Sequence, residues 1–119
     1  MIPSLEPLVR DMVQKKRQAD FCFWQLGILR ERAAQGERFD QDEFSKKTRE
    51  LSGLEQEILE IVGKVQSHGC TVKDLGVGLL DFPAVIEQKP AYLCWRLGET
   101  EVRFWHTVDD GFAGRRRLE

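Results

Sequence analysis

The chain has little of what marks secreted, membrane-spanning or metal-binding proteins. Its 119 residues include three cysteines and two histidines, and no run of 18 apolar residues occurs. Met1 is not followed by the basic and then apolar segments of a signal peptide. We therefore expect a protein that neither spans a membrane nor is secreted and that resides in the cytoplasm.

The cysteines match no ligand or redox motif. Cys22, Cys70 and Cys94 are odd in number, and a zinc site would have to combine them with His68 and His106 from widely separated segments. Buried or idle thiols in a reducing compartment are the expected state. We expect neither a metal nor a cofactor.

An excess of charge of either sign is also missing. The chain carries 18 basic and 20 acidic side chains, for a net charge of -2. This balance argues against binding to nucleic acid or to an anionic membrane. Phosphate-binding loops, His-Glu-x-x-His motifs and paired cysteines are absent as well. These absences favour a protein without catalysis, although acid/base sites can be assembled from isolated residues.

What the sequence does contain is a hydrophobic repeat of seven residues in its first half. The rows on the first segment are Leu5, Met12, Ala19, Leu26, Ala33 and Leu8, Cys22, Leu29; those on the second are Phe44, Leu51, Ile58, Val65 and Leu54, Ile61, His68. Lys15 and Lys47 interrupt them. The pattern predicts two long, coiled-coil-like helices in residues 4–68.

Residues 36–44 predict a sharp break between these helices. Gly36 suits a helix C-terminus, and Asp40 and Glu43 stand at capping-box spacing. Phe39 and Phe44 occupy the two positions of a hydrophobic staple across that cap. The two helices should therefore form an antiparallel hairpin.

The predicted helices are longer than a compact domain of this size. At 1.5 Å per residue each spans about 42 to 46 Å, whereas a globule of this length is about 35 Å across. The hairpin must protrude or pair with another chain. Three aromatic residues also widen the apolar surface of the first helix, so we expect a homodimer. Its candidate interface is Phe21, Phe23, Trp24, Leu26 and Ile58.

After Gly69 the hydrophobic period changes to two, which is typical of strands. Residues 71–75 and 85–87 are weak candidates, and residues 91–97 and 102–107 are strong ones. A turn at residues 98–101 would place Trp95 opposite Phe104 and Arg96 opposite Arg103. The face with Leu93, Trp95 and His106 should then pack on the helices.

The fold class is therefore α+β. A long helical hairpin is followed by a small antiparallel sheet and a tail (69–119), all in one domain, 1–119.

Five segments of the second half together resemble a known family. They are Lys73-Asp74-Leu75, Gly78-Leu79-Leu80-Asp81-Phe82-Pro83, Tyr92-Leu93-Cys94-Trp95-Arg96-Leu97-Gly98-Glu99, Trp105-His106 and Gly111-Phe112-Ala113-Gly114-Arg115. Their order is similar to that of the small prokaryotic family called domain of unknown function 2203. Members typically begin with a Phe-Thr-x-x-Glu-Ala stretch, which this chain lacks. The resemblance implies no activity, substrate or cofactor.

Two classes of function stay open. The favoured one is a homo-oligomeric interaction or scaffold module, with a protein partner that the sequence cannot name. The alternative is a small ligand- or anion-binding domain, or an enzyme, that uses the polar face of the C-terminal hairpin. The candidate anion-binding residues are Tyr92, Arg96, Arg103, Trp105 and Arg115, the last in a glycine-flanked segment.

Three further polar residues of the family-like segments have no assigned role. Asp81, before Phe82 and Pro83, is expected to be a turn or capping carboxylate, and Glu99 a solvated turn residue. His106 is expected at the edge of an apolar face. A strand rise of about 3.3 Å per residue separates Glu99 from His106 by roughly 13 Å, which argues against one shared metal site.

Overall fold

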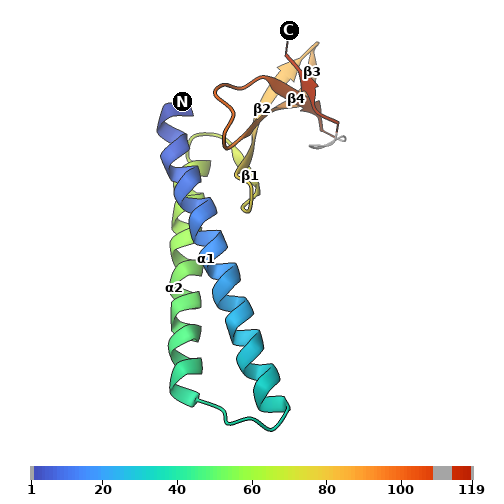
Figure 1. Ribbon diagram of the computed structural model, residues 1–119. Helices are drawn as coiled ribbons and strands as arrows, with labels where there is room; N and C mark the ends of the chain where they lie inside the picture. The colour runs from blue at the N-terminus through green and yellow to red at the C-terminus, as the bar shows by residue number, and fades with distance from the viewer. Residues whose placement is uncertain (1, 109–113, 119) are drawn as a thin grey trace.

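Two long antiparallel helices carry a small sheet at one end (Figure 1). The structure, a computed structural model, describes residues 2–108 and 114–118. The elements in that part of the chain are α1 Ile2–Ala34, α2 Gln41–Gln66, β1 Thr71–Asp74, β2 Leu79–Ile86, β3 Lys89–Arg96, β4 Phe104–Thr107 and β5 Arg116–Arg117. The predicted α+β class is confirmed. The molecule measures 62 × 26 × 20 Å, so the hairpin does protrude.

The break between the helices has the predicted capping chemistry. The Asp40 side chain accepts a hydrogen bond of 3.1 Å from the Glu43 backbone N–H. The Phe39 and Phe44 rings lie 5.2 Å apart, as a staple requires. Gly36 has a φ of +87°, a left-handed value that favours glycine after a helix. Local sequence thus sets where α1 ends and α2 begins.

The heptad rows of the two helices face each other. Lys15, which interrupts one row, lies 2.9 Å from Asp11 and 3.6 Å from Glu57 of α2. Lys47 donates to the Gln25 side chain at 3.1 Å. Both lysines are therefore accommodated within one chain, at the flanks of the seam.

Two of the candidate dimer residues lie inside this seam. Leu26 and Ile58 are 4% and 6% exposed. The chain's own hairpin already covers both side chains, so a second chain is not needed to bury them. A seven-residue repeat shows which residues face a neighbouring helix, but not whether that helix belongs to the same chain.

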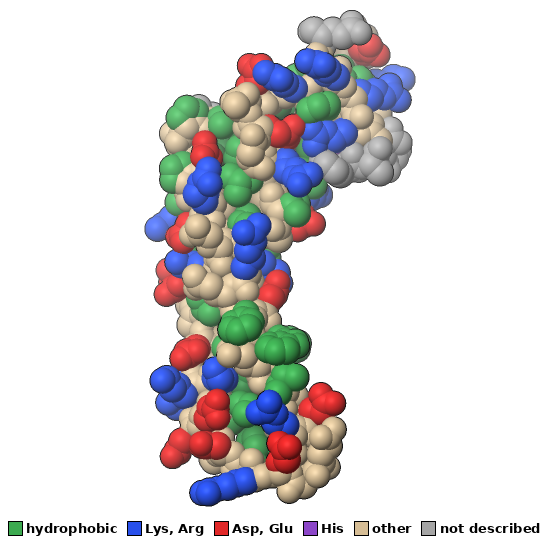
Figure 2. All heavy atoms as spheres, in the orientation of Figure 1, with side chains coloured by type: hydrophobic (Ala, Val, Ile, Leu, Met, Phe, Trp, Pro, Cys, Tyr) green, Lys and Arg blue, Asp and Glu red, His purple; other side chains and the backbone are tan. Residues whose placement is uncertain are grey.

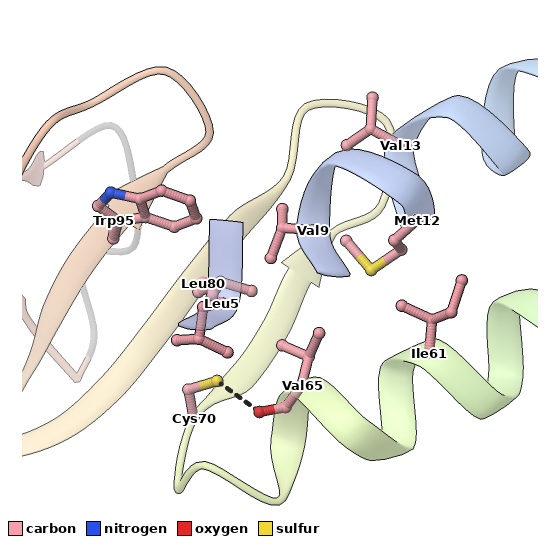
Figure 3. Packing of buried hydrophobic residues seen from close by; sticks show 9 residues of the cluster. All are labelled: Leu5, Val9, Met12, Val13, Ile61, Val65, Cys70, Leu80 and Trp95. Atoms are coloured by element: carbon pink, nitrogen blue, oxygen red, sulfur yellow. Dashed lines mark hydrogen bonds between the residues drawn. The ribbon is translucent and has the colours of Figure 1, made fainter. Parts of the chain in front are cut away.

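The hydrophobic core joins the sheet to one end of the hairpin (Figure 3). Its members come from α1, α2, the connection before β1, and strands β2 and β3: Leu5, Val9, Met12, Val13, Ile61, Val65, Cys70, Leu80 and Trp95. Gly78 allows this close packing, since a Cβ there would lie 2.7 Å from Val9 Cγ1 and 2.9 Å from Leu97 Cβ. The start of β2 thereby rests directly against α1.

The sheet is an antiparallel meander with strand order β1-β2-β3-β4-β5. β2 is longer than predicted and runs through Pro83, in a part of the strand that lies past its pairing with β1. Proline is tolerated in such an edge position. A two-residue turn joins β2 to β3, and Glu87 and Gln88 both have positive φ, 54° and 65°. Such turns favour Asn and Gly, so this hairpin had no sequence signal.

The predicted register between β3 and β4 is wrong by one residue. Cys94 pairs with Phe104 and Tyr92 with His106, and β4 begins only after Arg103. Arg96 and Arg103 are therefore not opposite each other in the ladder. A shift of one residue moves every side chain of a strand to the other face. His106 accordingly lies on the face away from the buried Trp95, and not against the helices.

Candidate functional site

The outer face of the sheet carries a buried acid–histidine pair. Asp81 of β2 and His106 of β4 are each 3% exposed, and His106 Nε2 lies 3.0 Å from Asp81 Oδ1. The expected role of Asp81 in a turn is therefore corrected, because this residue stands within β2. The pair links two strands that are separated by β3.

The hydrogen-bond partners of the His106 imidazole indicate which of its nitrogens carry a proton. His106 Nδ1 lies 2.8 Å from the Thr107 carbonyl oxygen, which can only accept, so Nδ1 carries a proton. Nε2 faces a carboxylate, so a second proton must lie between His106 and Asp81. Burial lowers the pKa of His106, but the hydrogen bonds to Asp81 and Thr107 outweigh it and raise this pKa above 6.5. The hydrogen bonds to Asp81 and Thr107 therefore stabilise the protonated form of His106.

Cys94 of β3 lies beside this pair without joining it. It is the cross-strand neighbour of Asp81 and is fully buried. Burial raises the pKa of its thiol to about 11, against the opposing charge of Arg115 and with smaller contributions from Asp81 and Glu99. A thiol that stays protonated is a poor nucleophile. Since both imidazole nitrogens already have partners, His106 is not free to act as a base for Cys94.

An aromatic ring and a cation cover the pair from one side. The Tyr92 ring lies 5.5 Å from the His106 ring, and Lys73 Nζ is 5.8 Å from the Tyr92 ring centre. These contacts close the outer face of the sheet over His106. The arrangement is that of a small polar core on the side of the sheet opposite Trp95.

Glu99 organises the long connection between β3 and β4. Its Oε1 accepts from the Arg96 backbone N–H at 2.7 Å, and its Oε2 accepts from Arg115 at 2.6 Å. The Glu99 carbonyl also accepts from Trp95 Nε1 at 2.9 Å. Glu99 was expected to be a solvated turn residue, but it is half-buried and accepts three hydrogen bonds, from Arg96, Arg115 and Trp95.

The basic residues predicted to bind an anion have separate surroundings. Arg103 donates to Glu101 at 2.8 Å. Arg115 stacks over Phe104 at 3.6 Å in addition to binding Glu99, and Arg116 lies 5.3 Å from the Trp105 ring centre. The glycine-flanked segment before Arg115 falls largely in residues 109–113, outside the described residues, and so does the predicted turn at Asp109, Asp110 and Gly111. Anion binding stays a prediction. The opposed pair of Arg96 and Arg103 that favoured it does not form, because the register differs.

Metal binding has no support from the cysteines and histidines. In residues 2–108 and 114–118, no three His, Cys, Asp or Glu side chains come together as a metal site would require. Cys22, Cys70 and Cys94 are all buried and free. Nor does either helix in that part of the chain have the length and apolarity to cross a membrane.

The second candidate surface lies halfway along the hairpin (Figure 2). Phe21, Phe23 and Trp24 of α1 are 58%, 65% and 60% exposed. Phe21 and Trp24 stack on each other, with ring centres 5.9 Å apart. We call these three residues the aromatic cluster. Large aromatic side chains exposed together are typical of interaction sites.

The comparison with protein families agrees with the resemblance seen in the sequence. A family model described as an uncharacterized conserved protein, DUF2203, matches residues 1–118. The chain belongs to this family. No curated protein and no solved structure matches it.

Four of the five segments that carry the DUF2203 resemblance lie in or next to strands β1 to β4. Asp81, Cys94 and His106 meet on its outer face, while Gly78 and Trp95 join it to the helices. Sequence reasoning missed the pairing of Asp81 with His106 because it took residues 76–83 for a loop. Three hydrophobic residues near Asp81, namely Leu79, Leu80 and Phe82, were the available signal for a strand there.

Proposed function

We propose that this protein is a non-catalytic interaction module that associates with a second copy of itself through the helical hairpin, in the cytoplasm. The observation that carries the proposal is the aromatic cluster, three large side chains on one turn of α1 that are each more than half exposed. Burying such a side chain completely is worth about 1.5 to 3 kcal/mol. A further protein surface would supply such burial to the side chains that it covers.

The uneven core of the hairpin supports the same proposal. The core members on α1 end at Val13, and those on α2 begin at Ile61. Beyond them, among the described residues, the helices pack mainly on each other, with Leu75 after β1 beside the groove that Ala19 and Ile58 line. An isolated pair of helices buries one stripe on each, and wider apolar surfaces need another layer.

The chemistry of the sheet favours a structural role for its polar residues. The Cys94 thiol is protonated and buried, and the imidazole of His106 has both nitrogens occupied. Glu99 and Arg115 satisfy each other at 2.6 Å. A general base needs a free nitrogen or carboxylate within reach of a substrate proton. These residues instead fasten strands and turns together.

Light scattering combined with size-exclusion chromatography tests the proposal. Doubling the mass of 13.8 kDa gives about 28 kDa for the dimer. We expect that mass at micromolar concentration and a shift toward the monomer when Phe21, Phe23 and Trp24 are all replaced by serine. Circular dichroism would show that the triple variant keeps its helices. A wild-type mass that stays monomeric as the concentration rises would contradict the proposal.

A further inference from the structure

An apolar groove runs beside one member of the aromatic cluster. It has a volume of about 510 Å³ and lies between the middle parts of α1 and α2. Its apolar lining is Ala19, Phe23, Leu51, Ile58, Leu59 and Leu75, and its polar lining is Lys16, Asp20 and Glu55. Phe23 and Leu59 are 65% and 66% exposed. The groove is thus an apolar hollow with charges of both signs.

The other two aromatic residues belong to a different face of α1. Phe21 and Trp24 stack on each other, and neither lines the groove. Residues three and four positions apart share a helix face, so Phe23 lies with Ala19 and Asp20 instead. The aromatic cluster therefore presents two surfaces, and Phe23 alone belongs to the groove.

The two helices that form the groove carry opposite net charges. α1 has six basic and four acidic side chains, a net charge of +2, and α2 has four basic and six acidic ones, a net charge of -2. The imbalance concentrates near the groove, where residues 50–60 contain four glutamates and no basic residue. Residues 12–22 of α1 contain three basic side chains and one acidic, Asp20, which lies 2.6 Å from Lys16. A second copy would match this pattern by laying its α1 on the first copy's α2.

Contacts within the hairpin show which residues lie at the same level. Lys15 lies 3.6 Å from Glu57, and Lys47 lies 3.1 Å from Gln25. In both pairs the residue numbers add up to 72. Lys16 is therefore level with residue 56, close to Glu55.

We infer that two copies pack groove to groove about a two-fold axis parallel to the hairpin, so that α1 of each copy lies on α2 of the other. The inference rests on the self-association proposed above. Rotation about this axis keeps every residue at its own level, so Lys16 of each copy meets Glu55 of the other, and Phe23 approaches Leu51. A two-fold axis perpendicular to the hairpin would instead place α1 on α1 and α2 on α2, with like charges opposed.

A charge-exchange series measured by sedimentation equilibrium tests the arrangement. Lys16→Glu and Glu55→Lys should each raise the dimer dissociation constant by about tenfold or more, because each variant opposes like charges twice per dimer. The double variant should return toward the wild-type value. An equimolar mixture of the two single variants should form heterodimers, since every contact in the mixed pair joins opposite charges. Lys46→Glu, on an exposed side chain of α2 outside the groove, is the matched control and should change little.

A pair of aromatic variants separates the two surfaces of the cluster. Phe23→Ser should raise the dissociation constant by about tenfold or more, and Trp24→Ser should leave it nearly unchanged. The opposite ranking, or single charge variants that the mixture does not rescue, would overturn the groove-to-groove arrangement while leaving self-association intact. A wild-type protein that remains monomeric would overturn both.

Discussion

The two ends of the hairpin share one sequence pattern but not one environment. Next to the sheet, Leu5 and Met12 of the repeat are fully buried, as is Val9 beside them. Toward the far end the same repeat leaves Leu29 and Leu51 half-buried. The difference arises because the sheet provides a second layer at one end only. A heptad repeat therefore specifies which side chains meet, and the neighbouring layer determines how deeply they are buried.

The largest expected effect comes from removing the contact between sheet and hairpin. Trp95 is fully buried in the core cluster, and its Nε1 donates to the Glu99 carbonyl. Trp95→Ala should lower the free energy of unfolding by about 3 to 5 kcal/mol. Leu26→Ala, in the two-helix seam, should cost about 2 kcal/mol because the thin seam can close around the missing atoms. Urea denaturation measures both values, and equal losses would show that the two ends are packed alike.

Glycine replacements test the same comparison through the backbone. Gly78 has a φ of +71°, and a Cβ there would overlap Val9 and Leu97. Gly78→Ala should therefore cost about 2 to 4 kcal/mol from strain and overpacking combined.

The matched control is Gly53→Ala in α2, where a Cβ meets no atom within 4 Å. This exposed helical position should gain about 0.5 to 1 kcal/mol. Thermal denaturation of both variants gives the sign of each change. A tolerated alanine at position 78 would mean that β2 does not rest against α1 as described.

The acid–histidine pair should make the sheet end sensitive to pH. The pKa of His106 is raised above 6.5 in the folded protein, so the native state binds the proton more tightly than the unfolded chain. Its contribution to stability is complete below pH 6.5 and is lost as the pH rises through the folded pKa. The free energy of unfolding should therefore fall as the pH rises from about 6.5 through the folded pKa of His106.

His106→Gln is the control, and its stability should vary less over the same range. The measurements are kept below the pH region in which Cys94, with its pKa raised from 9.0 to about 11, adds a slope of its own. Chemical denaturation at a series of pH values measures both proteins. An identical pH dependence for wild type and His106→Gln would rule out a proton held by this residue.

The smallest effects are expected at the far end of the hairpin. Phe44 is half-buried and contacts both the Phe39 ring and, at 5.3 Å from its centre, the Arg30 guanidinium. Phe44→Ala should cost about 1 to 2 kcal/mol, and Phe39→Ala, which removes only the exposed half of the staple, less than about 1 kcal/mol. Thermal unfolding of the two variants ranks them. Equal midpoints would show that Phe44 contributes nothing to the seam.

Local rules predicted the helical half of the molecule well. The cap at Asp40, the staple of Phe39 and Phe44, and the antiparallel return all depend on residues a few positions apart. The sheet was predicted less completely. Glu87 and Gln88 form a tight turn without the usual residues, and Glu99 fastens a connection longer than the predicted turn through bonds to Arg96 and Arg115. Such bonds set the register, and alternation of hydrophobic residues does not reveal them.

By itself the sequence determined the fold class, the two helices and the turn between them, because periodicity and capping act over a few neighbouring residues. Only the tertiary structure decided that Asp81 meets His106, and that Leu26 and Ile58 are covered by their own chain while Phe23 is not. Those outcomes depend on strand register and on where the sheet rests along the hairpin. Both are set by contacts between residues far apart in the chain, which no local pattern records.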